Sequence, residues 1–304
     1  MMPVFRFLIF TLLSLATCFE VDAQDSVRVL TWNVQMLPRL VKPNGKKKRA
    51  RAIVEELRKR DYDMIVFQEL FYAPSRKIVV KGLAECYPYH TSVLNKKALT
   101  LKSNGGVMLF SRHPIRDVVE IRFKQRMGMD RFSRKGALLA NIDLGGKKIQ
   151  VIGTHLQAFG DQEILYSQYR QLAKELLKPN EKTGIPQLVC GDFNTLKSIP
   201  AELPPDVSKD LIDRLPRYQV MLFTLDAQDG ELYSHQQFTM DRPYNDLCVT
   251  RKDRRLLLDY ILIRPNGIKG LSLRREIKIM RHPWDKQHQD LSDHFGLEAV
   301  LSGF

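Results

Sequence analysis

Cysteine is scarce in this chain of 304 residues, and the four cysteines follow no metal-binding spacing. Cys18 lies in an apolar N-terminal run, so Cys86, Cys190 and Cys248 are left, and three cysteines can form one disulfide at most. A scaffold held together by several disulfides is therefore excluded, and no His/Cys spacing indicates a zinc site. Cys190 lies within an apolar run, and we expect it to be a buried thiol.

Three further absences narrow the chemistry. The chain has no Gly-x-Ser-x-Gly motif, which argues against a serine nucleophile of the hydrolase type. It also has no Gly-x-x-x-x-Gly-Lys-Ser/Thr loop for nucleotide phosphates. Neither an internal repeat nor a linker divides the sequence. We therefore predict one catalytic domain over residues 24–304, which is long enough to bury a large core.

The first 23 residues have the form of a secretory signal peptide. Arg6 is a short basic region, Leu8 to Ala16 is mostly apolar, and Val21-Asp22-Ala23 offers a cleavage site before Gln24. The apolar part is too short to span a bilayer. We expect export to the periplasm or the outside of the cell, with no transmembrane helix in the mature chain. The alternative is a lipoprotein signal at Cys18, which the preceding threonine fits poorly.

Positive charge dominates the chain, with 48 Lys and Arg against 34 Asp and Glu, for a formal charge of +14. Removal of residues 1–23 leaves 47 basic and 32 acidic residues, or +15. This balance predicts anionic partners, namely nucleic acid, phosphorylated small molecules or a lipid surface, without choosing among them. The basic run Lys46-Lys47-Lys48-Arg49 is typical of a solvated surface.

Strand and helix patterns follow each other along the chain. Residues 27–34 and 64–70 read as strands, and Ala50, Ile53 and Leu57 between them fall at helical spacing. Further strands are expected over 107–110, 137–144, 147–152, 188–191 and 255–263 and after 294, a helix over 165–176, a surface excursion over 200–216, and two or more irregular strands over 218–250. The pattern predicts an α/β domain of two packed sheets with helices outside.

The segment from Leu188 to Thr195 places an acid and an amide directly after a predicted strand. Gly191 is expected to let the backbone turn as it leaves that strand. In extended chain Asp192 and Asn194 leave on the same side, where their oxygens suit a hard divalent cation and a phosphate. Glu69 also closes an apolar run, where a carboxylate is costly unless it is paired or bound to a metal.

Polar residues of this kind stand at six predicted strand ends: Asn33, Glu69, His155, Asp192 with Asn194, Asp259, and Asp293 with His294. Each alone is explained by a turn or a structural hydrogen bond. Together they supply what metal-assisted hydrolysis of a phosphate ester requires. Carboxylates hold a divalent ion, one histidine takes a proton from water, and a carboxylate behind it fixes the tautomer. The second histidine or an amide stabilises charge on the phosphoryl group.

Six motifs in this order resemble the endonuclease/exonuclease/phosphatase family over residues 26–301. They are Thr31-Trp32-Asn33, Phe67-Gln68-Glu69, Gly153-Thr154-His155, Gly191-Asp192-Phe193-Asn194, Leu258-Asp259-Tyr260-Ile261 and Ser292-Asp293-His294. The resemblance implies a four-layer α/β sandwich, with two mostly antiparallel sheets flanked by helices. It also implies a Mg²⁺ cofactor, with Mn²⁺ or Co²⁺ as alternatives.

The resemblance further implies a role for each site residue. Glu69 is the principal Mg²⁺ ligand, with Asn33 beside it and Asp293 near the metal. Asp192 and Asn194 hold the attacking water and the phosphate, and His155 stabilises the transition state. His294 is the general base, and Asp259 orients it.

Four segments resemble the neutral sphingomyelinases, in particular the secreted bacterial ones. They are Asn104-Gly105-Gly106-Val107, Lys135-Gly136-Ala137, Thr154-His155-Leu156-Gln157-Ala158 and Asp290-Leu291-Ser292-Asp293-His294. The likeness implies a sphingophospholipid substrate at a membrane surface, with Asn104 and Lys135 in substrate binding. The chain departs from the bacterial toxins in lacking a clear aromatic-tipped hairpin, for which Trp284 is the nearest candidate.

We therefore expect a secreted phosphodiesterase that acts on sphingomyelin or on a relative such as ceramide phosphoethanolamine. It is expected to be a monomer that lies peripherally at membranes and has no stable nucleic-acid partner. Two alternatives remain at this stage. One is a secreted nuclease of the same fold, which the positive charge would suit. The other is an inactive relative that binds membranes or a partner.

Overall fold

The computed structural model describes residues 26–38, 41, 45–97, 102–158, 161–199, 209, 211–248, 250 and 254–304. The predicted signal peptide, its cleavage site, Cys18 and most of the 200–216 excursion lie outside the described residues. Within them Cys86, Cys190 and Cys248 form no disulfide. No helix in this part of the chain combines the length and the apolar character that crossing a bilayer requires.

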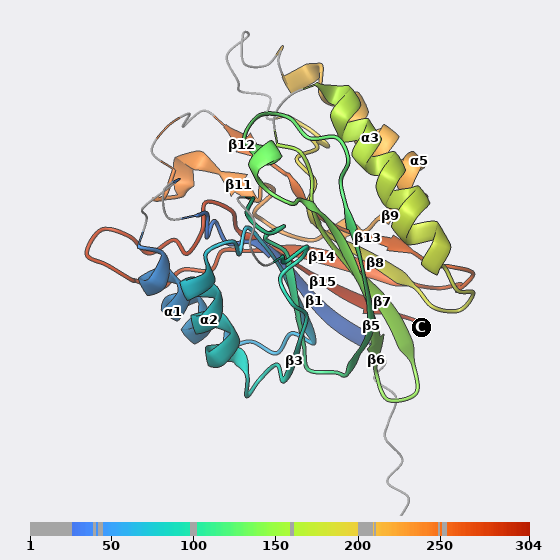
Figure 1. Cartoon of the computed structure of the whole chain (residues 1–304), viewed down its shortest axis with the longest axis horizontal. Coiled ribbons are helices and arrows are strands. Elements are labelled where there is room, and N and C mark those ends of the chain that lie inside the picture. Colours follow the sequence, from blue (N-terminus) through green and yellow to red (C-terminus); the bar gives the residue numbers. More distant parts are fainter. Residues whose placement is uncertain are drawn as a thin grey trace, which may run out of the picture.

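Two sheets packed face to face form the centre of the described structure, and helices cover their outer faces (Figure 1). The first sheet has the order β10 (Glu231–Leu232), β14 (Ser272–Lys278), β15 (Gly296–Ser302), β1 (Ser26–Asn33), β2 (Met64–Gln68), β4 (Met108–Ser111) and β3 (Tyr89–His90). The second has the order β5 (Ile115–Arg122), β6 (Gly136–Asp143), β7 (Lys148–His155), β8 (Gln187–Asp192), β13 (Asp259–Arg264) and β9 (Gln228–Asp229).

Both sheets are mixed, with mainly antiparallel neighbours. The β1–β2, β10–β14 and β7–β8 pairs run parallel. A small separate ribbon joins β11 (Met240–Asp241) and β12 (Arg255–Leu256). The predicted sandwich of two sheets with helices outside is confirmed, because α1 (Lys46–Leu57) and α2 (Ala73–Leu83) lie on one side and α3 (Gln162–Leu172) and α5 (Pro216–Leu225) on the other (Figure 1).

Alternation along the strands explains the layering. Val27 and Val29 of β1 belong to the core between the sheets, whereas Leu30 and Trp32 belong to the core under α1 and α2. Successive side chains of a strand point to opposite faces, so a strand covered on both faces is apolar on both. Ile53 of α1 belongs to the same core as Leu30 and Trp32, the one under α1 and α2.

Several segments differ from the sequence-based expectation. Residues 216–225 form a helix, not irregular strand: Pro216 starts it, and Tyr218, Met221 and Leu225 bury one face. The strand expected over 255–263 is broken, because β12 ends at Leu256 and β13 begins only at Asp259. Helix α2 and strands β5 and β14 were not predicted.

Candidate active site

The predicted site residues meet at one edge of the sandwich, where strands of both sheets end. In the second sheet His155 is paired with Asp192, and Asp192 in turn with Asp259, so these residues form one row across β7, β8 and β13. Asn33 ends β1 in the first sheet, and its amide nitrogen donates to Asp192 Oδ2 at 3.0 Å. Residues from across the chain are thereby brought together.

Gly191 allows the row to form, for a reason other than the predicted turn. Strand β8 continues through it to Asp192, and a Cβ at position 191 would lie 2.1 Å from the Thr154 carbonyl oxygen of β7. Glycine is therefore required by close strand approach. The extended chain expected beyond it is also wrong, since Asn194 has a φ of 49° and its backbone N–H donates to Asp192 Oδ1 at 3.0 Å.

His294 and Asp259 form a buried pair. His294 Nδ1 lies 2.8 Å from Asp259 Oδ2, and His294 Nε2 lies 4.0 Å from Asp192 Oδ2. Trp32 Nε1 donates to the His294 carbonyl at 2.8 Å, which fixes the backbone of the histidine from β1. Burial opposes a charge on His294, but Asp259, with Asp192 and Asp293, outweighs it and raises the pKa of His294 to about 10.

Carboxylates gather on the other side of this pair. Glu69 directly follows β2 with a φ of 57°, a conformation that non-glycine residues seldom adopt. Burial, and then the Asp293 carboxylate, raise the pKa of Glu69 to about 7. Burial and Asp259 likewise raise the pKa of Asp192 to about 6. Removal of the two carboxylates from water is the main cause of both raised pKa values, and repulsion from the neighbouring acids adds to it.

His155 is buried beside a cation. Its Nε2 lies 3.1 Å from Lys135 Nζ and 3.6 Å from Asp192 Oδ2. Burial, followed by Lys135 and His294, holds the pKa of His155 well below its usual range, so the ring is neutral. Lys135 also donates to the Leu156 carbonyl at 3.1 Å. The fixed positive charge at this end of the site therefore resides on Lys135.

Two of the three predicted amides, Asn194 and Asn104, hydrogen-bond to loops of the site. Asn194 Nδ2 donates to the Leu156 carbonyl at 3.2 Å. Asn104 accepts from the Gly106 backbone N–H at 2.9 Å and donates to the Phe71 carbonyl at 3.4 Å. Asn104 thus holds the turn next to Glu69, and its predicted contact with substrate stays a prediction.

Two residues that support the site, Arg49 and Asp130, were not predicted. Arg49, expected on a solvated surface, is fully buried, and its guanidinium donates to the Leu291 and Gln35 carbonyls, each at 2.7 Å. It thereby joins the loop after β1 to the segment before Asp293. Asp130 accepts from Lys135 Nζ at 3.0 Å. Charge alone signals neither role, since both depend on folded neighbours.

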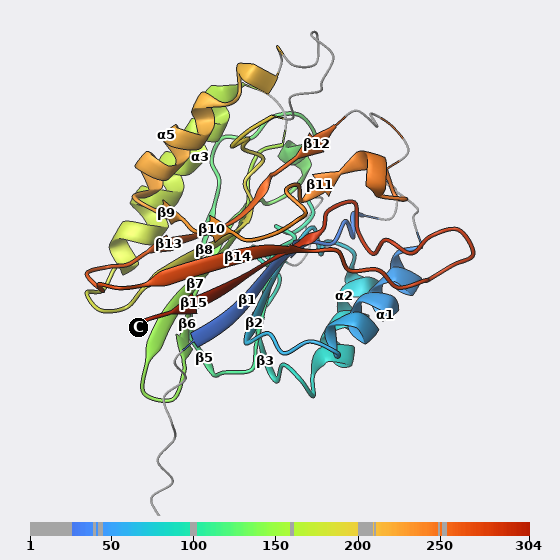
Figure 2. The same cartoon turned by 180° about the vertical axis from the view of Figure 1, so that it is seen from behind.

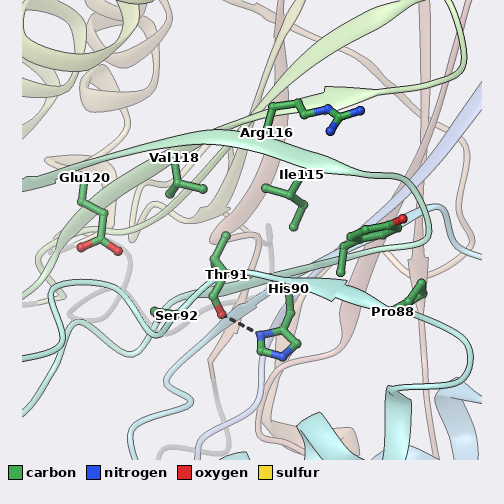
Figure 3. Close-up of a pocket in the computed structure, with 9 residues that line it drawn as sticks. Pro88, His90, Thr91, Ser92, Ile115, Arg116, Val118 and Glu120 are labelled. Atoms are coloured by element: carbon green, nitrogen blue, oxygen red, sulfur yellow. Dashed lines mark hydrogen bonds between the residues drawn. The ribbon is translucent and has the colours of Figure 1, made fainter.

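A cavity of about 510 Å³ opens at this edge of the sandwich. Its lining includes Glu69, Lys135 and His155 together with Leu37, Pro38 and Phe71. A second hollow of about 530 Å³ lies between β3 and β5, lined among others by His90 and Glu120 (Figure 3). There His90 Nδ1 faces the Thr91 carbonyl at 3.0 Å, and none of the predicted site residues lines it.

The acids at the first cavity fit a divalent cation. Asp192, Asp259 and His294 offer ligand atoms that all lie within 4.8 Å of one another, and one oxygen of buried Asp259 has no hydrogen-bond partner. Glu69 and Asp293 add two further carboxylates. Carboxylate oxygens are the ligands that Mg²⁺ prefers. The donor set therefore suits Mg²⁺ better than it suits a soft metal.

Comparisons with known proteins agree with this geometry. The chain is 26% identical to the phospholipase C of Staphylococcus aureus over 90% of this chain and 86% of that protein. It is 30% identical to sphingomyelinase C 2 of Leptospira interrogans, over 74% of this chain and 39% of that protein. A crystal structure of a S. aureus beta toxin mutant with bound magnesium ions shares the fold, with a TM-score of 0.78, 24% identity, and coverage of 90% of this chain and 99% of that one.

A profile of the endonuclease/exonuclease/phosphatase family matches residues 30–294. That range includes every residue of the row, the Glu69 carboxylate and both histidines. The fold and the family predicted from the six motifs are confirmed. The chain belongs to the endonuclease/exonuclease/phosphatase family.

Proposed function

We propose that this protein is an exported, Mg²⁺-dependent phosphodiesterase that hydrolyses sphingomyelin, or a related sphingophospholipid such as ceramide phosphoethanolamine. Ceramide and a phosphorylated head group are the products. The observation that carries the proposal is the buried His294–Asp259 pair at 2.8 Å. Asp192 lies between His294 and His155, and His155 lines a cavity whose wall changes from charged to apolar. A phospholipid has the same change of character between phosphate and chains.

The reaction follows from the polarity of the groups. His294 Nε2 faces Asp192, so it is the nitrogen placed to take a proton from water as that water attacks phosphorus. The bond between phosphorus and the ceramide oxygen breaks, and the departing oxygen takes up a proton from solvent. Asp259 holds Nδ1 and stabilises the imidazolium that forms. Lys135, beside neutral His155, faces the negative charge that develops on the phosphoryl oxygens.

Glu69 and Asp293, with Asp192 nearby, would hold the Mg²⁺. When bound, the ion would polarise the phosphate and offset the negative charge of these carboxylates. The offset of negative charge also affects the pKa of His294, the base. Without a cation the surrounding carboxylates hold the pKa of His294 at about 10, so the histidine is already protonated at neutral pH. A protonated imidazole cannot accept a proton from water. A cation held by Glu69 and Asp293 would lower that pKa by offsetting Asp293 and Asp192, while Asp259, the carboxylate that raises it most, stays paired with His294.

The test offers the purified protein four substrates in parallel: sphingomyelin, ceramide phosphoethanolamine, phosphatidylcholine and plasmid DNA. Each is incubated with Mg²⁺ and with chelator. Release of phosphocholine from sphingomyelin, or of phosphoethanolamine from ceramide phosphoethanolamine, only with Mg²⁺ supports the proposal. The positive charge favours one other function, a nuclease, and cleavage of DNA with both sphingolipids untouched would establish that instead. No turnover of any substrate would indicate an inactive relative.

A further inference from the structure

Four apolar side chains are exposed at the mouth of the catalytic cavity. Met129 is 70% exposed, Phe132 65%, Val41 52% and Met127 37%, and all four line the cavity. We call this group the apolar rim. Contiguous exposed apolar surface is uncommon on soluble proteins and marks a binding surface.

Hydrogen bonds connect the segment that carries Met127, Met129 and Phe132 to the site. The Met127 backbone N–H donates to Gln157 Oε1 at 3.1 Å, and Gln157 Nε2 donates back to the Met127 carbonyl at 3.1 Å. Asp130 turns inward to Lys135 at 3.0 Å. The short helical turn Gly128–Phe132 thus directs Asp130 at the site and exposes Met129 and Phe132 to solvent.

The segment that carries Met127, Met129 and Phe132 is rich in basic residues. Between residues 122 and 135 the chain has six Arg and Lys and a single acid, Asp130, which is bound to Lys135. Arg122 and Arg131 are exposed there. Apolar side chains that enter the acyl boundary, with basic side chains at phosphate level, are the pattern of a protein that lies on a phospholipid layer.

The one aromatic that the sequence suggested for membrane entry is engaged elsewhere. Trp284 Nε1 donates to the Asp290 carbonyl at 2.9 Å, and its ring stacks on His288 with centroids 5.2 Å apart. The ring also packs against Gly45, at the start of α1. Figure 2 shows the loop between β14 and β15 beside α1, in keeping with this packing. Trp284 is therefore part of the protein's own packing.

We propose that the apolar rim, formed by Val41, Met127, Met129 and Phe132, is the surface by which this protein binds a phospholipid layer. The cavity mouth then faces the layer directly. A lipid that moves from the layer into the cavity then places its phosphate at Lys135 and His155, while its acyl chains contact the rim. This inference rests on the proposed lipid substrate and names the surface that meets it.

The test compares the double variant Met129→Ser/Phe132→Ser with Phe223→Ser. Phe223 is 89% exposed, lies on α5 and lines a different hollow, so its replacement removes an exposed aromatic side chain away from the rim. Binding to equimolar sphingomyelin and phosphatidylcholine vesicles is measured by sedimentation in chelator, so that no turnover intervenes. With Mg²⁺, turnover is measured on the same vesicles and on bis(4-nitrophenyl) phosphate, a soluble phosphodiester.

We expect vesicle affinity to fall about tenfold or more in the double variant and to stay unchanged in Phe223→Ser. The ratio of vesicle turnover to soluble turnover should fall with it. Equal vesicle binding by all three proteins would overturn the inference, as would a wild-type dimer that the double variant loses. Wild-type protein that binds vesicles through the rim but hydrolyses no lipid would contradict the proposed function alone. Thermal unfolding of each variant verifies that the fold is retained.

Discussion

The buried pair of His294 and Asp259 gives the sharpest prediction about catalysis. Loss of a general base lowers a rate by about 10²–10⁴-fold, so His294→Ala should reduce kcat by that factor with little change in KM. Asp259→Asn keeps the shape but removes the charge from a hydrogen bond of 2.8 Å. Such a bond contributes about 1.5–3 kcal/mol. If the whole contribution acts in the transition state, kcat falls about 10- to 150-fold.

The double variant tests whether the two residues act on one proton. An amide at position 259 can donate to Nδ1 and so hold the tautomer whose Nε2 already bears a proton. In a protein without His294, the substitution at position 259 has no imidazole whose tautomer it could change. The double variant should therefore be no slower than His294→Ala alone.

The assay measures kcat and KM for both single variants and the double variant, beside thermal unfolding with and without Mg²⁺. Both residues are buried, so some loss of stability is expected and must be separated from the loss of rate. Losses in kcat that multiply fully would refute the shared-proton reasoning. So would a His294→Ala protein that unfolds earlier but keeps its turnover.

Four other outcomes are expected. Glu69→Ala should abolish turnover and weaken Mg²⁺ binding in calorimetry while the fold stays intact; normal turnover in the variant, or of the wild type in chelator, would contradict the metal assignment. The raised pKa values of Glu69 and Asp192 mean that the cation-free folded protein holds these protons more tightly than the unfolded chain, so its stability is lost as pH rises through about 6 to 7. Because Mg²⁺ replaces those protons, it should raise Tm more at about pH 8 than at about pH 5.5, and an equal or reversed effect in thermal unfolding would argue against these carboxylates as ligands. Arg49→Met should lower the free energy of unfolding by about 3–5 kcal/mol in denaturant titration, since several carbonyls lose their donor, whereas a change within error would mean that Arg49 is dispensable. The exported protein should begin near Gln24 in N-terminal sequencing, and a mature chain that begins at a lipidated Cys18 would show that the lipoprotein signal is used instead.

Four of the motif residues were predictable because each follows or closes a strand that the sequence marks clearly. Short apolar runs end at Asn33, Glu69, His155 and Asp192, and the carboxyl ends of parallel neighbours, β1 with β2 and β7 with β8, meet at one edge. The row across β7, β8 and β13 follows once those strands pair. What one sequence does not show is which end meets which, and here the resemblance to a known family supplied the order.

The remaining errors have physical causes. Arg49 stands in a basic run that looks solvated, yet helix α1 turns it inward to carbonyls that exist only in the folded chain. Helix α5 was missed because its apolar residues at helical spacing follow a proline-rich stretch that reads as loop. The contact of Asp130 with Lys135 joins two residues in a segment without clear periodicity.

The position of β15 has a consequence for how the protein is made. This strand, the last one described, lies between β14 and β1, and its partner β1 is the first strand described. His294 lies directly before it, and Trp32 holds the carbonyl of that histidine across 262 positions of sequence. Contacts over such separations form late, because a long loop must close first. A chain still emerging from the ribosome therefore lacks both Asp293 and His294 at the site, and His294 joins the row across β7, β8 and β13 only when β15 has paired with β1.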